Sequence, residues 1–244
     1  MHDSLAIVLV EPQSPGNIGM VCRAMKNMGI HRLRLVKGCD RLHPEALKFA
    51  VSARDLLEQA QLFPSLEAAL ADTTISVATT RRTGKYRREL MTPPQVARMI
   101  HQQAGGMAAL VFGREDHGLT TDELSRCTLQ ATIPSSSDYG SLNLAQSVLI
   151  FCYELFSGTA GEVDDTARRQ LAASGELEPL FDQMQATLLS IGYLNPQNPD
   201  HIMRSLRRIL FRSGLDSREA ALLRGMFSQI DWAARNFDGR KKTR

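Results

Sequence analysis

The apolar residues in the first two-thirds of the chain fall into short runs, each followed by a polar segment. Apolar runs of this length, bounded by turn residues, are typical of strands that are buried in a parallel sheet. The pattern predicts five strands, at Leu5–Val10, Leu33–Val36, Thr74–Ala78, Ala108–Phe112 and Leu129–Ile133.

Between these runs, apolar residues recur at the spacing that places them on one face of a helix. In the first such segment, Asn17 is a suitable N-cap and Gly29 ends the helical pattern. Two further helices are predicted, one after Pro44 and one over Pro93–His101. Strands that alternate with helices indicate an α/β domain with a mostly parallel sheet.

The helix predicted over Leu142–Phe156 is apolar on nearly all sides. A helix of this kind is covered on two sides, and only one of them can be the sheet. The second cover is either another copy of the chain or the C-terminal segment. One apolar stripe consists of Leu144, Val148, Cys152 and Leu155, and the apolar residues outside it are Leu149, Ile150, Phe151 and Phe156.

Residues 158–175 are rich in Gly, Ala, Asp and Thr and have no apolar rhythm, which is typical of a linker. We therefore divide the chain into an α/β domain (1–157), this linker, and a helical C-terminal domain (176–244) with a basic tail. Three apolar stripes predict three helices in that domain. They consist of Leu180, Phe181, Met184, Leu188 and Ile191, of Ile202, Leu206, Ile209 and Leu210, and of Leu222, Met226, Ile230 and Ala233.

The composition is that of a globular protein, with 43% hydrophobic and 23% charged residues among 244, and it excludes a disordered chain. The apolar runs are too short to cross a bilayer, and the N-terminus lacks the basic start of a signal peptide, so we expect a cytoplasmic protein without a membrane partner. The four cysteines form no CxxC pair and there is no HExxH motif. We expect no disulfide and no metal site.

The net charge is only +3, but the positive residues gather in two places. Five of them surround a glycine and a tyrosine after the third strand, and such a loop suits RNA because it offers phosphate contacts and a stacking ring. A basic face on the second C-terminal helix is another candidate RNA contact, and solvated charges are the alternative for both. The loop residues are Arg81, Arg82, Lys85, Arg87 and Arg88, and the helix residues are Arg204, Arg207, Arg208 and Arg212.

Three loops that follow predicted strands are candidates for a ligand site, because ligands bind beyond the carboxyl ends of parallel strands. They comprise residues 11–17, 112–118 and 134–143. Gly113, Gly118 and Gly140 permit close approach of a ligand to the backbone. No GxGxxG motif follows a strand and no GxxxxGK[ST] motif occurs, which disfavours dinucleotide and P-loop nucleotide binding.

Taken together, these loops resemble the three motifs of the SPOUT superfamily of RNA methyltransferases. Over about residues 4–235 the chain is similar to the bacterial members that methylate the ribose of nucleotide 32 in the tRNA anticodon loop. The resemblance implies a SPOUT-type α/β domain with a C-terminal trefoil knot, followed by a small all-helical domain, and it implies a homodimer. The motifs are Gly16-Asn17-Ile18-Gly19 with Arg23, Leu110-Val111-Phe112-Gly113-Arg114-Glu115 with Gly118-Leu119, and Ile133-Pro134 through Ser141-Leu142-Asn143-Leu144-Ala145.

The resemblance also implies that S-adenosylmethionine is the cofactor and tRNA the partner. Apolar walls and backbone groups suit an adenine, and the glycines leave room for it. By matched position, the cofactor residues are Thr79, Thr80, Arg81, Gly113, Ile133, Gly140, Ser141 and Leu142.

In this superfamily the residue that matches Arg23 activates the 2′-hydroxyl group. An arginine is a poor base because its pKa exceeds about 12, so two roles stay open for Arg23: a base assisted by a phosphate, or a cation that steadies the developing alkoxide. Glu115, Ser141 and Asn143 would orient the loops and the ribose, with Tyr139 as a further contact, and Arg82 would bind a phosphate near the reacting sugar. The alternatives are methylation of ribosomal RNA and a non-catalytic RNA-binding protein.

Overall fold

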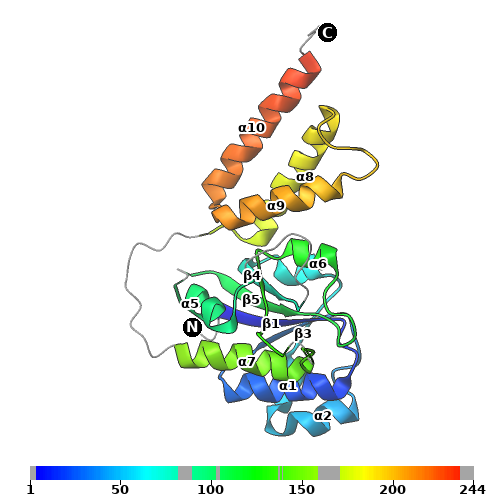
Figure 1. Cartoon of the computed structure of the whole chain (residues 1–244), viewed down its shortest axis with the longest axis vertical. Coiled ribbons are helices and arrows are strands. Elements are labelled where there is room, and N and C mark those ends of the chain that lie inside the picture. Colours follow the sequence, from blue (N-terminus) through cyan, green and yellow to red (C-terminus); the bar gives the residue numbers. More distant parts are fainter. Residues whose placement is uncertain are drawn as a thin grey trace.

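The computed structural model describes residues 4–81, 90–102, 105–136, 138, 140–158 and 171–236. Its centre is a six-stranded sheet in the order β3-β2-β1-β5-β4-β6, in which all neighbouring strands run parallel (Figure 1). The mostly parallel α/β sheet expected from the sequence is thereby confirmed. The strands are β1 (Leu5–Val10), β2 (Arg32–Val36), β3 (Gln61–Phe63), β4 (Thr73–Thr79), β5 (Met107–Phe112) and β6 (Leu129–Ala131).

Helices cover both faces of the sheet, and the alternation of side chains along β1 shows why. Leu5, Ile7 and Leu9 contribute to the larger apolar core, whereas Val8 and Val10 contribute to a smaller core on the other face. Helices α1, α2, α3, α5 and α7 border the larger core, and α4 and α6 border the smaller one. Their bounds are α1 (Pro15–Asn27), α2 (Pro44–Ala50), α3 (Arg54–Gln59), α4 (Leu66–Leu70), α5 (Pro93–Gln102), α6 (Thr121–Arg126) and α7 (Leu144–Ser157), with a 3₁₀ turn, η2, at Val51–Ala53.

Several element boundaries differ from the sequence-based expectation. The N-cap of α1 is Ser14, whose hydroxyl accepts from the backbone N–H of Asn17, and Pro15 occupies the first turn, so Asn17 is not the cap. The fifth predicted strand ends at Ala131, which leaves Ile133 beyond the sheet. Helix α7 begins at Leu144 because Asn143 caps it.

Three C-terminal helices form an apolar core of their own, separate from the two cores of the sheet. They are α8 (Ser174–Ser190), α9 (Asp200–Ser213) and α10 (Ser217–Asn236). Helix α8 thus begins inside the range expected for the linker. Its first turn is joined to the sheet by hydrogen bonds from the Gly175 N–H to the Ala71 carbonyl (2.9 Å) and from the Ser174 hydroxyl to the Thr73 carbonyl (3.0 Å).

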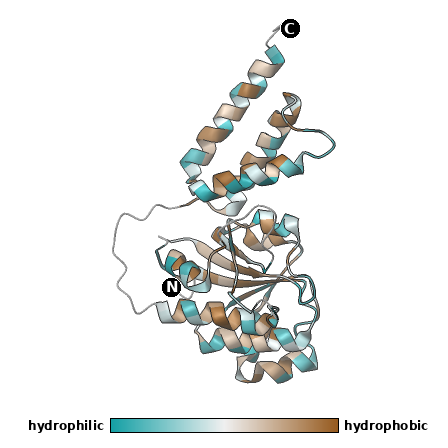
Figure 2. Ribbon diagram, viewed as in Figure 1, coloured by the Kyte–Doolittle hydropathy of each residue, from teal (hydrophilic) through white to brown (hydrophobic). Residues whose placement is uncertain are grey.

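All three predicted C-terminal stripes are wrong in part, the first because Ile191 is 45% exposed at the end of α8. Ile209, Leu222 and Met226 are 53%, 66% and 46% exposed, whereas the buried residues of these helices include Met203 and Phe227. Each helix packs against only one or two neighbours, so a stripe chosen from apolar spacing alone includes positions that face solvent. Figure 2 shows apolar positions along the exposed length of α10.

Arg207 does not belong to a solvated basic face. Its guanidinium donates to both carboxylate oxygens of Glu178, each at 2.7 Å, and lies 4.2 Å from the ring centroid of Phe181. The side chain is only 15% exposed. Arg207 therefore joins α9 to α8, and the cationic surface of α9 is smaller than the sequence suggested.

Helix α7 has the second apolar side that its sequence indicated. One side packs into the sheet core through residues such as Val148 and Phe151. On the other side Leu149, Tyr153 and Phe156 are 39%, 54% and 50% exposed, so the described part of the chain leaves this side uncovered. The C-terminal helices lie elsewhere, above the opposite region of the sheet (Figure 1).

Candidate active site

One cavity of about 220 Å³ lies beyond the carboxyl ends of β4, β5 and β6. The strands β2 and β3 lie on one side of β1, and the later strands β5, β4 and β6 lie on its other side. Ligands of parallel sheets usually bind near such a reversal of strand order. All eight residues expected to bind the cofactor line the cavity. They are Thr79, Thr80, Arg81, Gly113, Ile133, Gly140, Ser141 and Leu142.

The loop after β5 forms one wall of the cavity and closes on itself. The Gly118 N–H donates to the Arg114 carbonyl at 2.9 Å. A Cβ atom at Gly113 would lie 2.2 Å from the carbonyl carbon of Gly118 and 2.3 Å from the nitrogen of Leu119. No side chain fits at that distance, so the loop requires glycine at position 113.

Arg114 fixes this loop through ion pairs with two glutamates. Its guanidinium donates to both carboxylate oxygens of Glu123 at 3.0 Å and to Glu11 at 2.9 Å, and its side chain is 10% exposed. The hydrogen bonds that Arg114 donates to Glu123 and Glu11 raise its pKa, so it stays charged. Burial alone would raise the pKa of Glu123, but the hydrogen bonds from Arg114 and the Thr120 N–H outweigh it and lower the pKa. Arg114 is therefore a structural cation.

A second network joins all three loops. The Glu115 carboxylate accepts from the backbone N–H groups of Gln13 (2.9 Å) and Ser14 (3.1 Å) at the start of α1, and from the side-chain amide of Asn17 (3.0 Å). The amide oxygen of Asn17 accepts from the side-chain amide of Asn143 at 2.9 Å. Asn17 is 8% exposed. One buried amide thus connects the loop after β5 to the start of α7.

Asn143 donates with its amide nitrogen and caps α7 with its amide oxygen. Its Oδ1 accepts from the backbone N–H groups of Ala145 (2.9 Å) and Gln146 (3.4 Å). Asn143 itself is not among the residues that line the cavity, whereas the adjacent Ser141 is. The geometry shows Asn143 holding the loop that carries Ser141, and Glu115 holding the loop that carries Gly113.

Arg23 lies apart from the cavity. It is an exposed residue of α1 and does not line the cavity, although α1 begins beside it. Arg23 follows Pro15 by eight residue steps, which correspond to about 12 Å of helix because each step adds about 1.5 Å. A single copy of the chain therefore does not place Arg23 in the cavity.

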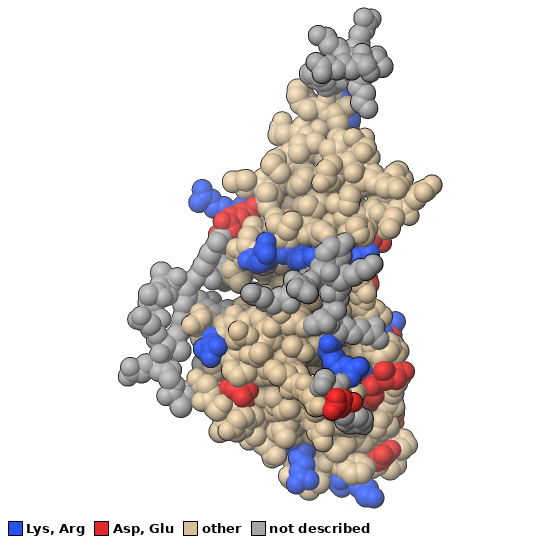
Figure 3. All heavy atoms as spheres, viewed as in Figure 1, with Lys and Arg blue, Asp and Glu red and all other residues tan. Residues whose placement is uncertain are grey.

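The predicted RNA contacts divide into two groups. Arg82, Lys85, Arg87 and Arg88, and also Tyr139, lie outside the described residues. Arg204 and Arg208 are half-buried on α9, where Figure 3 shows positive side chains gathered on the visible face. The Nε atom of Arg208 is buried and has no hydrogen-bond partner within the described part of the chain.

The sequence reasoning missed functional roles for Asn17, Arg114, Asp116 and His117. Arg114, Asp116 and His117 line the cavity, and Asn17 joins its walls. Asn17, Arg114 and Glu115 belong to the motifs quoted above, so their positions in the sequence indicated that they lie near the site. Asp116 and His117 lay in a candidate loop, but nothing in their spacing indicated that the two side chains contact each other.

Two kinds of feature are absent from the residues that the structure describes. No three histidine, cysteine, aspartate or glutamate side chains come together there as a metal site would require. Within the same residues, every helix is too short or too polar to cross a membrane.

The chain matches two protein-family profiles. Residues 4–153 match the SpoU rRNA Methylase family, and residues 175–241 match the family described as tRNA methyltransferase TrmJ, C-terminal domain. The first match covers the sheet and its helices up to α7, and the second covers the three C-terminal helices.

Named relatives are similar over nearly the full length. A tRNA (cytidine/uridine/adenosine-2′-O-)-methyltransferase TrmJ of Pseudomonas aeruginosa is 37% identical, over 96% of each chain. The tRNA (cytidine/uridine-2′-O-)-methyltransferase TrmJ of Salmonella typhimurium is 34% identical, over 95% of this chain and 98% of its own. The crystal structure of TrmJ from Z. mobilis ZM4 superposes with a TM-score of 0.83 at 36% identity, over 93% of this chain and 98% of that one.

The substitution Asn17→Asp tests the amide that joins the loops. It places a second carboxylate against Glu115 and removes one of the three donors to Glu115, the side-chain amide of Asn17. We expect a loss of about 2–3 kcal/mol in the free energy of unfolding at pH 7, measured by urea denaturation. The two carboxylates repel each other only while both are ionised, and this repulsion raises the folded-state pKa of the pair above its value in the unfolded chain. Part of the lost stability is therefore regained as the pH falls toward about 5.

Asn27→Asp, the same change at the exposed C-terminal end of the same helix, is the matched control. A negative charge is only weakly unfavourable there, so we expect a loss of no more than about 1 kcal/mol and a correspondingly smaller regain as the pH falls. Equal destabilisation of the two variants at both pH values would contradict the role of Asn17.

Proposed function

Because the chain belongs to the SpoU methylase family and carries a TrmJ-type C-terminal domain, we propose that it methylates the 2′-oxygen of a tRNA ribose with S-adenosylmethionine as methyl donor. The observation that carries this proposal is the cavity that three loops build at the carboxyl ends of β4, β5 and β6. The near full-length similarity to tRNA 2′-O-methyltransferases from Pseudomonas aeruginosa and Salmonella typhimurium supports the same reaction.

The residues of the cavity suit S-adenosylmethionine in charge and in shape. Ile133 and Leu142 provide apolar surface for an adenine, and Thr79 and Thr80 line the cavity at the end of β4. Arg81 complements a carboxylate, whereas the acidic side chains of the loop after β5 complement the sulfonium and ammonium charges. The cofactor supplies an already activated methyl group, so the protein has chiefly to align it with the ribose.

Alignment is the main contribution of this chain, since ideal positioning supplies up to about 7–11 kcal/mol of a barrier. Glu115 and Asn143 fix the loops against α1 and α7, and Ser141 presents its hydroxyl to the cavity. For Arg23 we favour the role of a cation that steadies the developing alkoxide, because a guanidinium holds its proton above about pH 12.

We assign the substrate as tRNA, methylated in its anticodon loop at nucleotide 32, with the reaction in the cytoplasm. The match of residues 175–241 to the TrmJ C-terminal domain favours tRNA over ribosomal RNA, which the description of the first family names. Arg204 and Arg208 are the phosphate contacts that we assign to α9, together with Arg82, Lys85, Arg87 and Arg88 from the loop after β4.

We further propose that the sheet unit (1–157) contains the trefoil knot of its superfamily and pairs with a second copy through the exposed side of α7. Leu149, Tyr153 and Phe156 form an exposed row on one side of the helix. Exposed apolar residues that are scattered singly are normal, whereas a group of them is typical of an interface. Helix α1 packs against α7, so this pairing brings the helix that carries Arg23 next to the interface. In that arrangement Arg23 reaches a cavity that it does not reach within one chain.

The reaction is tested by transfer of a labelled methyl group from S-adenosylmethionine to unmodified bulk tRNA and, separately, to ribosomal RNA, followed by nucleoside mapping. We expect label on a 2′-oxygen in the anticodon loop of tRNA. Arg23→Ala should lower the single-turnover rate by about 10²-fold or more while the cofactor Kd, measured by calorimetry, is unchanged. Label on ribosomal RNA alone replaces the substrate, and cofactor binding without transfer to either RNA indicates the non-catalytic RNA binder.

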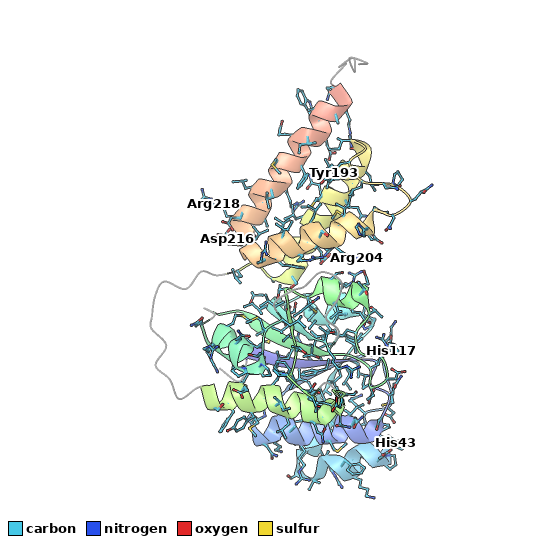
Figure 4. The ribbon with its side chains drawn as sticks, in the orientation of Figure 1. His43, His117, Tyr193, Arg204, Asp216 and Arg218 are labelled. Atoms are coloured by element: carbon cyan, nitrogen blue, oxygen red, sulfur yellow. The ribbon has the colours of Figure 1, made fainter. Side chains whose placement is uncertain are left out.

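Neutralising Arg204 and Arg208 tests the contact of α9 with phosphate. The double variant Arg204→Ala/Arg208→Ala should bind tRNA more weakly at low salt, and the slope of log Kd against log salt should fall by about one per lost contact. Arg218→Ala, at an exposed arginine of α10, is the control and should leave both unchanged (Figure 4). A slope that is the same in all three proteins would remove α9 from the RNA interface.

The pairing through α7 is tested by the substitution Leu149→Lys. A charge in a buried apolar interface has a large desolvation cost, so we expect the molar mass from light scattering to fall from that of two chains to that of one. Leu222→Lys changes an equally apolar residue that is 66% exposed on α10 and should leave the mass unchanged. Dimers in both variants would exclude this face as the interface.

A further inference from the structure

The first turn of α8 meets the sheet unit at the start of β4. The Gly175 N–H donates to the Ala71 carbonyl at 2.9 Å, and the Ser174 hydroxyl donates to the Thr73 carbonyl at 3.0 Å. We call these two hydrogen bonds the α8–β4 seam. Ser174 and Thr73 are 7% and 0% exposed, so the second bond is shielded from water and holds α8 at a defined position against the sheet.

The two segments approach each other so closely at the seam that position 175 requires glycine. A Cβ atom at Gly175 would lie 2.7 Å from the carbonyl oxygen of Ala71, the same oxygen that accepts from the Gly175 N–H. This neighbour is backbone and cannot rotate away as the end of a flexible side chain can. An added methyl group would therefore push the first turn of α8 away from the start of β4.

Apolar packing alone does not fix α8 against the sheet. A cavity of about 250 Å³ lies between the two units, lined by Thr74 and Ile75 of β4 on one side and by Leu177 of α8 and Phe211 of α9 on the other. Well-packed interiors have few voids larger than a water molecule, so the units touch here without interlocking. The position of α8 on the sheet therefore depends strongly on the hydrogen bonds of the seam.

Helix α9 is fixed to α8 and follows its position. The two helices share one apolar core, and the guanidinium of Arg207 on α9 donates to both carboxylate oxygens of Glu178 on α8. Arg204 and Arg208, the phosphate contacts that we assign to α9, belong to the same helix as Arg207. A shift at the seam would therefore displace these two arginines as well.

Helix α9 also lies next to the cofactor cavity. It packs against α6, whose Glu123 binds Arg114 of the loop that forms one wall of the cavity. Figure 4 places Arg204 where the C-terminal helices border the sheet unit. The phosphate contacts and the cavity thus lie near each other, at a separation that the seam determines.

We propose that Ser174 and Gly175 are positioning residues that determine which nucleotide is methylated, an inference that rests on the proposed function. An RNA whose phosphates are bound on α9 presents one ribose to the methyl group in the cavity, and the separation of the two sites selects that ribose. A displacement of about 1 Å far from the reacting atoms can lower a rate by about 10²-fold, so a small shift of α8 changes which ribose is aligned.

The substitution Gly175→Ala tests this role. Alanine favours a helix more than glycine does, so the change weakens the contact with Ala71 and not α8 itself. In single-turnover transfer to unmodified tRNA, with mapping of the methylated nucleotide, the wild type should label one nucleotide. The variant should label that nucleotide about 10-fold more slowly or worse and should place part of the label on adjacent nucleotides, with an unchanged cofactor Kd from calorimetry.

Gly225→Ala is the matched control, because an added Cβ atom at this position within α10 meets no described atom within 4 Å. It should map and react as the wild type does. Hydrogen exchange followed by mass spectrometry checks the seam directly: exchange in the first turn of α8 should be faster in Gly175→Ala and unchanged in Gly225→Ala. Ser174→Ala, which removes the hydroxyl and adds no atom, should give a smaller redistribution of label in the same direction.

The outcomes are distinct. Wild-type protein that transfers no methyl group to tRNA overturns the proposed function itself. If the wild type is active, faster exchange in the first turn of α8 with all label still on the wild-type nucleotide overturns the selection of the nucleotide by the seam. A slower rate at that nucleotide alone, in Gly175→Ala and in Ser174→Ala, likewise leaves the two residues with a structural role only.

Discussion

The active-site region depends on one buried amide, that of Asn17. Its nitrogen donates to Glu115, 98 residues away, and its oxygen accepts from Asn143, 126 residues away. A carboxylate on one side requires a donor and an amide nitrogen on the other requires an acceptor, and a side-chain amide offers both groups at once. Aspartate at this position would leave Glu115 without its donor, and leucine would leave both loops without a partner, in a buried environment where an unmet hydrogen bond costs about 1–3 kcal/mol.

The same network explains why so few groups remain for chemistry. Glu115 places a negative charge at the N-terminal end of α1 and accepts from the N–H groups of Gln13 and Ser14 just before that helix, and Asn143 caps the first turn of α7. Residues that a motif brings together are therefore largely engaged in building the loops. Among the polar residues that line the cavity are Thr79 and Thr80 at the end of β4, Ser141 and His117.

Most of the sheet was predictable, because each buried strand except β3 reads as an apolar run. β3 is three residues long and has exposed Leu62 at the edge of the sheet, so its sequence resembles a loop. The cavity residues could be named only through the motif resemblance, since residues 79–81, 113, 133 and 140–142 meet through the parallel register of strands distant in sequence. Arg207 shows what local patterns miss. Its charge faces Glu178, 29 residues earlier, and nothing in its own helix reveals that partner.

The pairing of β1 with β5 has a consequence for biosynthesis. Leu5 is aligned with Ala108, so the central strand lacks its neighbour until about a hundred further residues have been made. At about 5–20 residues per second the ribosome needs roughly 5–20 s for that length. During this interval β1 can pair only with β2 and pack under α1, which makes the first βαβ unit the template that β5 later joins. The β1–β5 contact at the centre of the sheet thus forms after the β1–β2 contact beside it, and an apolar strand edge is open to other chains until then.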